Sequence, residues 1–267
     1  MVSSEQRRRQ LAREKYERQM KNRAEAQRRA KRRNVIVGVS LVTAAAVVVG
    51  LAVGGVFSSD DKKNDAAPQA APSTSSAAVT PVKGCNPPAA GKPNGKQWKA
   101  EPAMTVDSKA SYTMAIDTSC GKVTVALDAA KAPHTVNSFN FLAGEQYFDH
   151  VKCHRLTTEG IYVLQCGDPT GSGSGGPGYQ FADENLTGAT YPAGTVAMAN
   201  AGPGTNGSQF FLVYKDTQLP PNYTPFGKIT GGLDVVQNIA GGGVQGGGGD
   251  GAPNANVVLN SVTVTKS

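Results

Sequence analysis

The chain has 267 residues, of which 39% are hydrophobic and 18% are charged, and its formal net charge is +7. This length allows one large domain or two small ones. The charge is uneven: residues 1–34 contain thirteen Lys or Arg and four Asp or Glu, a net +9, so residues 35–267 carry a net −2. The high pI therefore belongs to the N-terminal arm and is no evidence that the folded part binds nucleic acid.

Residues 1–34 form a basic arm. Its central part, residues 4–33, has no Pro or Gly and is rich in Arg, Lys, Gln, Glu and Ala, which favours a helix. No apolar stripe runs along it, so we expect a solvated helix or a disordered arm rather than part of a core. Tyr16 is the one aromatic residue of the arm. This composition does not favour nucleic-acid binding, and we predict no nucleic-acid partner.

Residues 35–57 are a run of 23 residues without a charged side chain. A helix of that length is ~35 Å long, enough to cross a hydrocarbon core of ~30 Å with some tilt. Because the basic arm ends at its boundary, the positive-inside rule places the N-terminus in the cytoplasm and the rest of the chain outside. The alternative is a cleaved signal peptide, but the basic region and the apolar run are both long for one. We predict an uncleaved signal anchor in the cytoplasmic membrane.

Residues 58–110 are rich in Ala, Pro, Ser, Asp and Lys, a composition that cannot bury enough apolar surface to fold. We predict a flexible linker, which over ~50 residues spans ~40 Å on average and holds the following domain away from the membrane. Cys85 and Trp98 lie in its second half. Whether that half packs on the domain stays open.

Residues 111–267 are predicted to form the folded domain. Alternating apolar and polar residues predict strands at 112–116 and 122–127. We also expect a hairpin at 153–167, strands at 195–199 and 208–213 on either side of a cluster of turn residues, and a last strand at 257–264. Residues 135–143 and 232–240 have apolar side chains at helical spacing and predict two short helices. Many strands with two short helices indicate a mainly β domain with a closed antiparallel sheet.

Residues 196–212 read V-A-M-A-N-A-G-P-G-T-N-G-S-Q-F-F-L, two apolar runs around a cluster of turn residues. If residues 208–212 are extended, Gln209 and Phe211 project to one face and Phe210 to the other. The first face then offers an amide beside an aromatic ring, which could hold an apolar ring and a carbonyl together. The pattern alone favours an ordinary hairpin with a half-buried strand.

The letters M-A-N-A-G-P-G-T-N-G-S-Q-F-F resemble the central signature of the cyclophilins, the peptidyl-prolyl cis-trans isomerases. A second block, at 154–156 and 160–168, resembles the family's H-R-hydrophobic and G-F-hydrophobic-hydrophobic-Q-x-G-D. The resemblance covers roughly residues 111–267, in the family's order. It implies a closed eight-stranded antiparallel β-barrel capped by two short α-helices.

The resemblance also implies an activity. Such an enzyme accelerates rotation about X-Pro peptide bonds in unfolded or partly folded proteins, here outside the cytoplasmic membrane. It needs no cofactor, because no covalent bond changes. The alternatives from other classes are a non-catalytic chaperone or scaffold that binds Pro-containing peptides, and a function carried by the basic arm. We expect the domain to be monomeric.

The resemblance further implies which residues form the site. Arg155 would be the catalytic cation that stabilises the twisted amide. The substrate backbone would be anchored by the side chains of Gln165 and Gln209. The main chain of Ala199, Asn200 and Ala201 would also anchor the substrate backbone. The proline pocket would be formed by Tyr162, Val163, Phe211 and Leu219, with Tyr223 nearby. His154 would make a structural hydrogen bond.

The sequence departs from the family pattern at several of these positions. Two extra residues lie between His154 and Gly160, and Leu219 and Tyr223 stand where many members carry Trp and His. Because the Trp is missing, we expect at most weak binding of the cyclic peptide cyclosporin, weaker than in members that have it.

Four cysteines, Cys85, Cys120, Cys153 and Cys166, show no CxxC motif and no His at zinc spacing. Their even number permits two disulfides outside the cytoplasm, with three possible pairings, or four unrelated buried thiols. The pair Cys153–Cys166 is favoured because it flanks the predicted hairpin. The three histidines have no clustered carboxylates near them in the sequence, so we predict no metal site.

Overall fold

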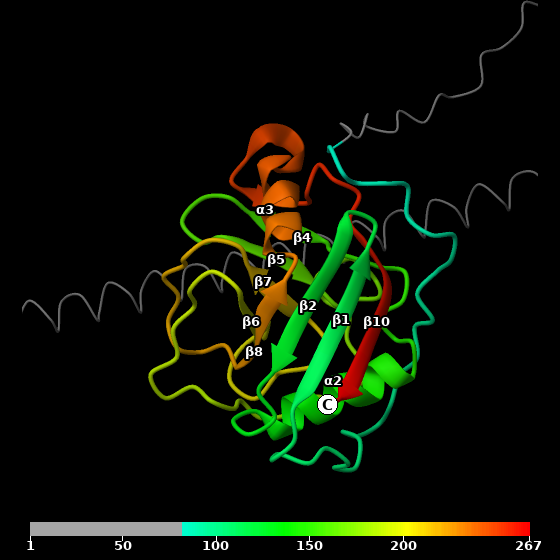
Figure 1. Cartoon of the computed structure of the whole chain (residues 1–267), viewed down its shortest axis with the longest axis vertical. Coiled ribbons are helices and arrows are strands. Elements are labelled where there is room, and N and C mark those ends of the chain that lie inside the picture. The colour runs from blue at the N-terminus through cyan, green and yellow to red at the C-terminus, as the bar shows by residue number, and fades with distance from the viewer. Residues whose placement is uncertain (1–81) are drawn as a thin grey trace, which may run out of the picture. The chain divides into compact units, whose positions relative to one another are not determined.

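The structure is a computed structural model that describes residues 82–267 (Figure 1). The basic arm, the expected membrane span at 35–57 and the first part of the expected linker lie outside these residues. Within the described range, no helix combines the length and the apolar character that crossing a membrane requires.

Residues 82–267 form ten strands and two α-helices, with one short 3₁₀ helix, Gln245–Gly247. The helices are α2 (Pro133–Gly144) and α3 (Leu233–Gly241), and both confirm predicted helices with small shifts at their ends. The strands are β1 (Tyr112–Thr118), β2 (Gly121–Leu127), β3 (Val151–Lys152), β4 (Arg155–Thr157), β5 (Val163–Cys166), β6 (Thr195–Met198), β7 (Phe210–Val213), β8 (Pro225–Gly231), β9 (Asp250–Gly251) and β10 (Val258–Lys266).

These strands form one antiparallel sheet in the order β3-β10-β1-β2-β8-β6-β7-β5-β4-β9. In Figure 1, β1, β2 and β10 lie in front of β4, β5 and β7, so the sheet curls around a core. The expected closed barrel of eight strands is therefore wrong in closure and in number. The sheet has ten strands, of which the two-residue strands β3 and β9 lie at the edges and do not pair with each other.

The two helices lie at opposite ends of the sheet in Figure 1, where α2 packs against β10 and α3 against β2. Phe139 of α2 is fully buried in an aromatic core, with its ring centroid 4.5 Å from that of Phe226 and 5.4 Å from that of Phe210. At the start of α2 the Glu184 carboxylate accepts the backbone N–H of Thr135 at 2.8 Å. A negative group at that end satisfies N–H donors that have no partner within the helix.

Strands β5, β6 and β7 are buried on both faces. On the inner face Leu164, Met198 and Phe210 belong to the main core. On the outer face a separate apolar cluster, here called the outer cluster, consists of Val163, Tyr191, Ala197, Phe211 and Val213. Phe210 and Phe211 therefore project to opposite faces, which confirms the alternation predicted from the sequence. The outer cluster is the apolar part of the candidate site.

The turn between β6 and β7 has the backbone that its sequence predicts. Gly202 and Gly204 have positive φ angles of 141° and 70°, a conformation that favours glycine. The buried Asn206 side chain donates to Asp183 Oδ1 at 2.9 Å, and the N–H of Gly204 donates to Asp183 Oδ2 at 2.9 Å. These bonds fix the main chain that follows β6 beside the outer cluster.

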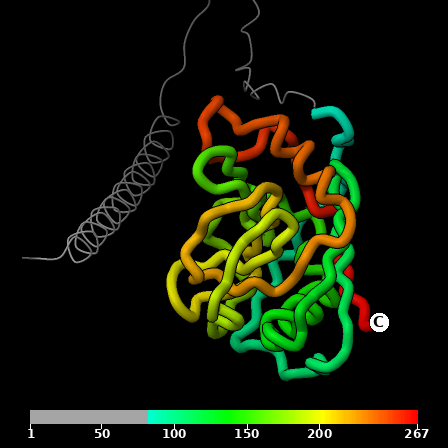
Figure 2. The backbone as a smooth tube through the Cα atoms, turned by 60° about the vertical axis from the view of Figure 1, so that its left-hand side comes forward, coloured from blue at the N-terminus to red at the C-terminus, as the bar shows by residue number. Residues whose placement is uncertain are grey.

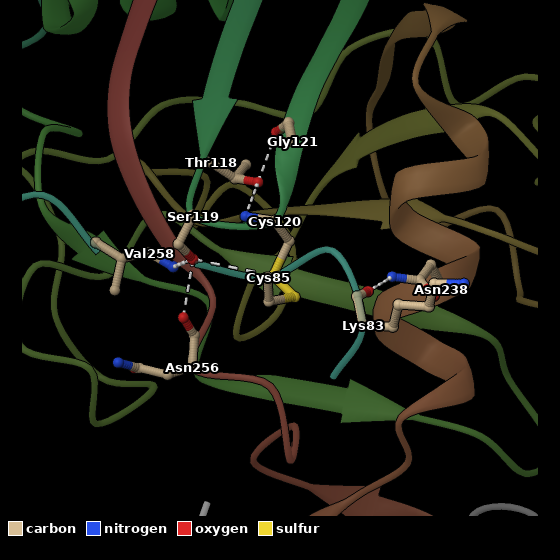
Figure 3. Close-up of a disulfide and its surroundings, with 9 residues drawn as sticks. All are labelled: Lys83, Cys85, Thr118, Ser119, Cys120, Gly121, Asn238, Asn256 and Val258. Atoms are coloured by element: carbon tan, nitrogen blue, oxygen red, sulfur yellow. Dashed lines mark hydrogen bonds between the residues drawn. A yellow bond between two sulfur atoms is a disulfide. The ribbon is translucent and has the colours of Figure 1, made fainter. Parts of the chain in front are cut away.

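Residues 82–110, here called the N-terminal segment, form no helix or strand but lie along the domain (Figure 2). A disulfide joins Cys85 to Cys120 in the turn between β1 and β2, and Asn238 of α3 donates to the Lys83 carbonyl at 2.6 Å (Figure 3). Further along, the ring of Trp98 packs edge-on at 5.1 Å from that of Phe141. Although the sequence assigned these residues to the linker, covalent and packing contacts attach them to the domain.

Candidate functional site

A row of four residues crosses the outer face of β4, β5, β7 and β6. The sheet register pairs Arg155 with Gln165, Gln165 with Phe211, and Phe211 with Ala197. Residues paired in this way lie on the same face of a sheet. The row therefore leads from a guanidinium through an amide to an aromatic ring. The Cys153–Cys166 disulfide confirms the favoured pairing and links the chain two residues before Arg155 to the residue after Gln165.

Arg155 is half-buried and its guanidinium donates three hydrogen bonds. Nε donates to Asp250 Oδ1 at 2.7 Å, Nη2 to Asp250 Oδ2 at 2.6 Å, and Nη1 to Gln165 Oε1 at 3.3 Å. The hydrogen bond to Asp250 raises the pKa of Arg155, and the same bond lowers the pKa of the Asp250 carboxyl. Both groups are therefore charged at neutral pH. Asp250 was not among the residues that the sequence suggested.

The two glutamines of the predicted site lie side by side. Gln165 Nε2 donates to Gln209 Oε1 at 2.8 Å. Gln209 Nε2 in turn donates to the carbonyls of Gly173 and Gly175, at 3.1 Å and 2.9 Å. Donation thus runs in one direction, from Arg155 through both amides to the loop at 171–178.

The loop at 171–178 is held from two sides. The buried Asp168 carboxylate accepts the N–H of Gly173 and, at 2.7 Å, the N–H of Thr170. Burial alone would raise the pKa of Asp168, but the hydrogen bonds from Thr170, Gly175 and Gly173 outweigh it, and the pKa is lowered. On the other side, the backbone N–H of Trp98 donates to the Pro177 carbonyl at 2.8 Å. The N-terminal segment therefore supports the loop that accepts from Gln209.

His154 does not make the structural hydrogen bond expected of it. Its two ring nitrogens are buried, and within residues 82–267 neither has a hydrogen-bond partner. Its ring lies beside Gly173, whose N–H is already bonded to Asp168 and whose carbonyl is bonded to Gln209. Burial lowers the pKa of His154, and the negative charge of Asp168 opposes that effect in part.

Phe211 and Val163 form the floor of the apolar part, and the half-buried Leu219 and Tyr223 pack at its edge. The rings of Phe211 and Tyr223 are 5.6 Å apart and nearly perpendicular. Tyr191 is a member of this cluster that sequence reasoning missed. Its hydroxyl donates to the Tyr223 carbonyl at 2.8 Å and accepts the Tyr223 N–H at 3.1 Å, so it fixes Tyr223 against Phe211.

Tyr162 does not join the pocket that the resemblance implied. It packs against the main core, with its ring 6.0 Å from that of Tyr214 and Lys215 Nζ 4.4 Å above it. Ile161 packs against the outer cluster in its place. Because neighbouring residues of an extended chain face opposite ways, Ile161 and Val163 share a face and Tyr162 lies on the other.

The main chain after β6 is partly free to bind a ligand. The N–H of Ala199 donates to the Gln209 carbonyl at 2.9 Å, and the N–H of Ala201 donates to Thr205 Oγ1 at 2.8 Å. Within the described residues, neither backbone group of Asn200 makes a hydrogen bond. Its side chain is held by donation to the Asn222 carbonyl at 2.8 Å. Asn200 is thus the position in this segment best placed to pair with a substrate backbone.

Two hollows lie near the outer cluster. One, of about 220 Å³, is lined by Tyr191, Thr217 and Leu219 and adjoins the cluster directly. The larger, an open groove of about 620 Å³, contains Tyr162, Tyr214 and Lys215 and none of Arg155, Gln165 or Phe211. No group of three or more His, Cys, Asp or Glu side chains in the described range is placed to hold a metal ion.

Comparison with known proteins matches this chain to one family. Residues 113–264 match the family model described as "Cyclophilin type peptidyl-prolyl cis-trans isomerase/CLD". The chain therefore belongs to the cyclophilin-type peptidyl-prolyl cis-trans isomerases. The resemblance stated from the motifs is confirmed, and the fold agrees.

The chain is also similar to curated relatives and to solved structures. The probable peptidyl-prolyl cis-trans isomerase B of Mycobacterium leprae is 46% identical over 72% of this chain and 64% of its own length. Its counterpart from Mycobacterium tuberculosis strain H37Rv is 48% identical over 57% of this chain and 54% of its own length. The chain thus spans between half and two thirds of these relatives.

A crystal structure of a cyclophilin-type peptidyl-prolyl cis-trans isomerase from Cryptosporidium parvum superposes with a TM-score of 0.53 at 27% identity, over 59% of this chain and 99% of that one. A second crystal structure of the same protein, determined in the presence of the dipeptide Ala-Pro, gives a TM-score of 0.52 at 28% identity, over 58% of this chain and 99% of that one. The similarity therefore extends over nearly the whole of a cyclophilin fold.

Proposed function

We propose that this protein accelerates cis-trans isomerisation of X-Pro peptide bonds in Pro-containing segments of unfolded or partly folded proteins. The observation that carries the proposal is the row on the outer face, in which the charged guanidinium of Arg155 lies beside the amide of Gln165 and the ring of Phe211. The crystal structure with Ala-Pro shows that a relative was studied with a Pro-containing ligand.

The reaction needs rotation without bond breaking. Rotating an X-Pro bond breaks the C–N resonance, and the barrier is ~18–20 kcal/mol. A catalyst must therefore bind the twisted amide better than the planar one. Twisting gives the prolyl nitrogen a localised lone pair, which a fixed cationic donor stabilises.

The described residues include candidates for the three parts of such a catalyst: a pocket for the prolyl ring, an anchor for the neighbouring peptide, and a cationic donor. The prolyl ring contacts Phe211 and Val163 in the outer cluster. The neighbouring peptide pairs with the free backbone groups of Asn200. Arg155 then donates to the prolyl nitrogen, and as an arginine it stays charged and keeps a rigid fork of donors. No proton transfer, metal or nucleophile takes part in these steps.

The test is isomerisation of an Ala-Pro peptide by the purified full-length chain, measured by NMR exchange. We expect Arg155→Ala to lower the catalysed rate by about a hundredfold, the scale for losing one transition-state donor, with peptide affinity little changed. If the wild-type chain binds Pro peptides without accelerating exchange, the protein is a binding module for chaperone or scaffold use, and the enzyme proposal is wrong.

We further propose that residues 35–57 anchor the chain in the cytoplasmic membrane and that the domain acts outside it. The uncharged run follows a basic arm, and two disulfides in the domain suit an oxidising compartment. Protease added to cells with an intact cytoplasmic membrane but a permeable envelope should digest the domain. Protection until the membrane is dissolved would place the domain inside.

A further inference from the structure

Asp250 adds an acidic group to the outer face at the end of the sheet. Strand β9 pairs with β4 so that Asp250 lies opposite Thr157. Thr157 is two residues from Arg155 and shares its face. Asp250 therefore lies diagonally across from Arg155, within reach of its guanidinium.

We propose that Asp250 is a positioning residue for the isomerase reaction, whose carboxylate holds the Arg155 guanidinium in the orientation that meets the prolyl nitrogen. This inference rests on the proposed function. It assigns a role to the Gly-rich segment at 241–251, none of whose residues was among the expected site residues.

The geometry of the pair fixes the guanidinium plane. A carboxylate that accepts from both Nε and Nη2 forms a bidentate ion pair, which restricts direction as well as distance. Of the five guanidinium N–H donors, Asp250 takes two and Gln165 takes one. Two donors therefore remain for a substrate, one on Nη1 and one on Nη2.

The ion pair also aligns the rest of the polar row. Arg155 donates to Gln165, Gln165 to Gln209, and Gln209 to the loop carbonyls. Asp250 lies at the head of this chain of donors, where it sets the position of Arg155 and, through it, that of Gln165. Such hydrogen bonds polarise one another in the same direction.

Asp250 itself is held by the backbone around it. The N–H of Thr158 donates to the Gly249 carbonyl at 2.8 Å, and the N–H of Gln245 donates to the Ala252 carbonyl at 2.8 Å. Gly249 lies so close to Glu159 that a Cβ at residue 249 would be 2.7 Å from its carboxyl carbon. The glycines of this segment let it approach β4 and bring the carboxylate to Arg155.

Asp250 has two opposing effects on the reaction rate. It orients the Arg155 guanidinium, which raises the rate, and it partly neutralises the positive charge, which lowers the rate, and the first effect is the larger. The side chains of Arg155 and Asp250 are 37% and 55% exposed, so solvent screens the field of the carboxylate at the substrate. An arginine without this partner has many rotamers, and a donor that points elsewhere loses its contact with the prolyl nitrogen completely. Removing Asp250 should therefore slow the reaction.

The experiment compares the full-length wild-type chain with Asp250→Ala, Asp250→Glu, Arg155→Ala and the double variant Arg155→Ala/Asp250→Ala. The exchange rate and the affinity for an Ala-Pro peptide are measured for each. We expect Asp250→Ala to lower the catalysed rate about tenfold with peptide affinity unchanged, and Asp250→Glu to restore part of it. In the Arg155→Ala background, Asp250→Ala should cause no further loss, because the carboxylate acts through the guanidinium.

Asp107→Ala is the matched control. Asp107 is an exposed carboxylate of similar exposure that pairs with Lys266 at 3.3 Å, so its removal costs a surface ion pair and should leave the rate unchanged. Should Asp250→Ala unfold, the near-isosteric Asp250→Asn takes its place. The ¹⁵N–¹H signal of Arg155 Nε then gives a second measurement, expected to be sharp in the wild type and lost by solvent exchange in Asp250→Asn.

Three results would overturn the proposal: an Asp250→Ala rate equal to or above wild type, a further loss of rate in the Arg155→Ala background, or an Nε signal unaffected by Asp250→Asn. A wild-type chain that accelerates nothing would refute the proposed function as well. If the wild type is active and Asp250→Ala has the same catalysed rate, only the role of Asp250 is refuted.

Discussion

The polar side chains of the site are largely ordered before a substrate arrives. Gln165 bonds Arg155 and Gln209, and Gln209 bonds the loop carbonyls. The entropy of ordering these long side chains is therefore lost during folding rather than during binding. Such preorganised donors stabilise developing charge without moving during the reaction.

Just before β5, two neighbouring side chains pack on opposite faces of the sheet. Ile161 packs against the outer cluster, whereas Tyr162 packs against the main core beneath Lys215. We expect Ile161→Ala to weaken Ala-Pro binding by roughly tenfold, because it removes apolar surface that packs against the outer cluster, which contains the prolyl-ring contacts Phe211 and Val163.

Tyr162→Ala is the matched comparison, measured by titration of the same peptide. It removes a larger side chain, but from the opposite face, so its effect on peptide affinity should be smaller than that of Ile161→Ala. The opposite ranking of the two variants would restore Tyr162 to the proline pocket.

The hairpin of β4 and β5 carries both Arg155 and Gln165, and one covalent bond joins its two ends. Cys153 and Cys166 are 13 residues apart and Cys85 and Cys120 are 35 apart. Loop-closure entropy predicts that removing these disulfides costs about 3 and about 4 kcal/mol of the free energy of unfolding. The two bonds are therefore similar in their effect on stability.

Their effects on the reaction should differ. We expect Cys153→Ala/Cys166→Ala to slow isomerisation under conditions where the domain stays folded, since β4 and β5 can then shift past each other. Cys85→Ala/Cys120→Ala is the control and should cost as much stability with a smaller change in rate. Denaturant unfolding and NMR exchange on both variants check this, and equal rate losses would contradict it.

The longer elements could be predicted from the sequence because each has its own local pattern. Strands β1 and β2 alternate, β7 is a short apolar run after a cluster of turn residues, and both helices have apolar residues at helical spacing. Strands β3 and β9 are two residues long and give no periodic signal. Asp250 was missed because it lies in one of these short strands, among glycines, and its partner Arg155 is 95 residues away in the sequence.

On the scale of the whole domain, acid should destabilise the fold in two steps. The pKa of His154 is lowered by burial from 6.5, so below pH 6.5 the unfolded chain binds a proton that the folded chain does not. Stability then falls by up to about 1.4 kcal/mol per pH unit. Asp168, whose pKa is lowered from 3.8, contributes stability above that pH and loses it as pH falls through its folded pKa.

His134 acts in the opposite sense. Its hydrogen bond to Glu101 raises its pKa above 6.5, so its contribution is present in acid and is lost as pH rises through the folded pKa. We expect His154→Gln to flatten the fall in stability as pH decreases below 6.5, and His134→Gln to remove a loss of stability that the wild type shows as pH rises above 6.5. Urea unfolding at a series of pH values measures both slopes, and an unchanged slope in His154→Gln would contradict this assignment.

The Cys85–Cys120 disulfide also determines how the domain responds to mechanical force. Tension on the chain before Cys85 passes through the sulfur atoms to the turn between β1 and β2. The residues between the two cysteines, including the Trp98 contact that supports the loop at 171–178, carry none of that load. A domain pulled at the chain before Cys85 would therefore keep the support of its binding face. The chain between the two cysteines, about 120 Å when fully extended, could not lengthen under this force until the disulfide is reduced.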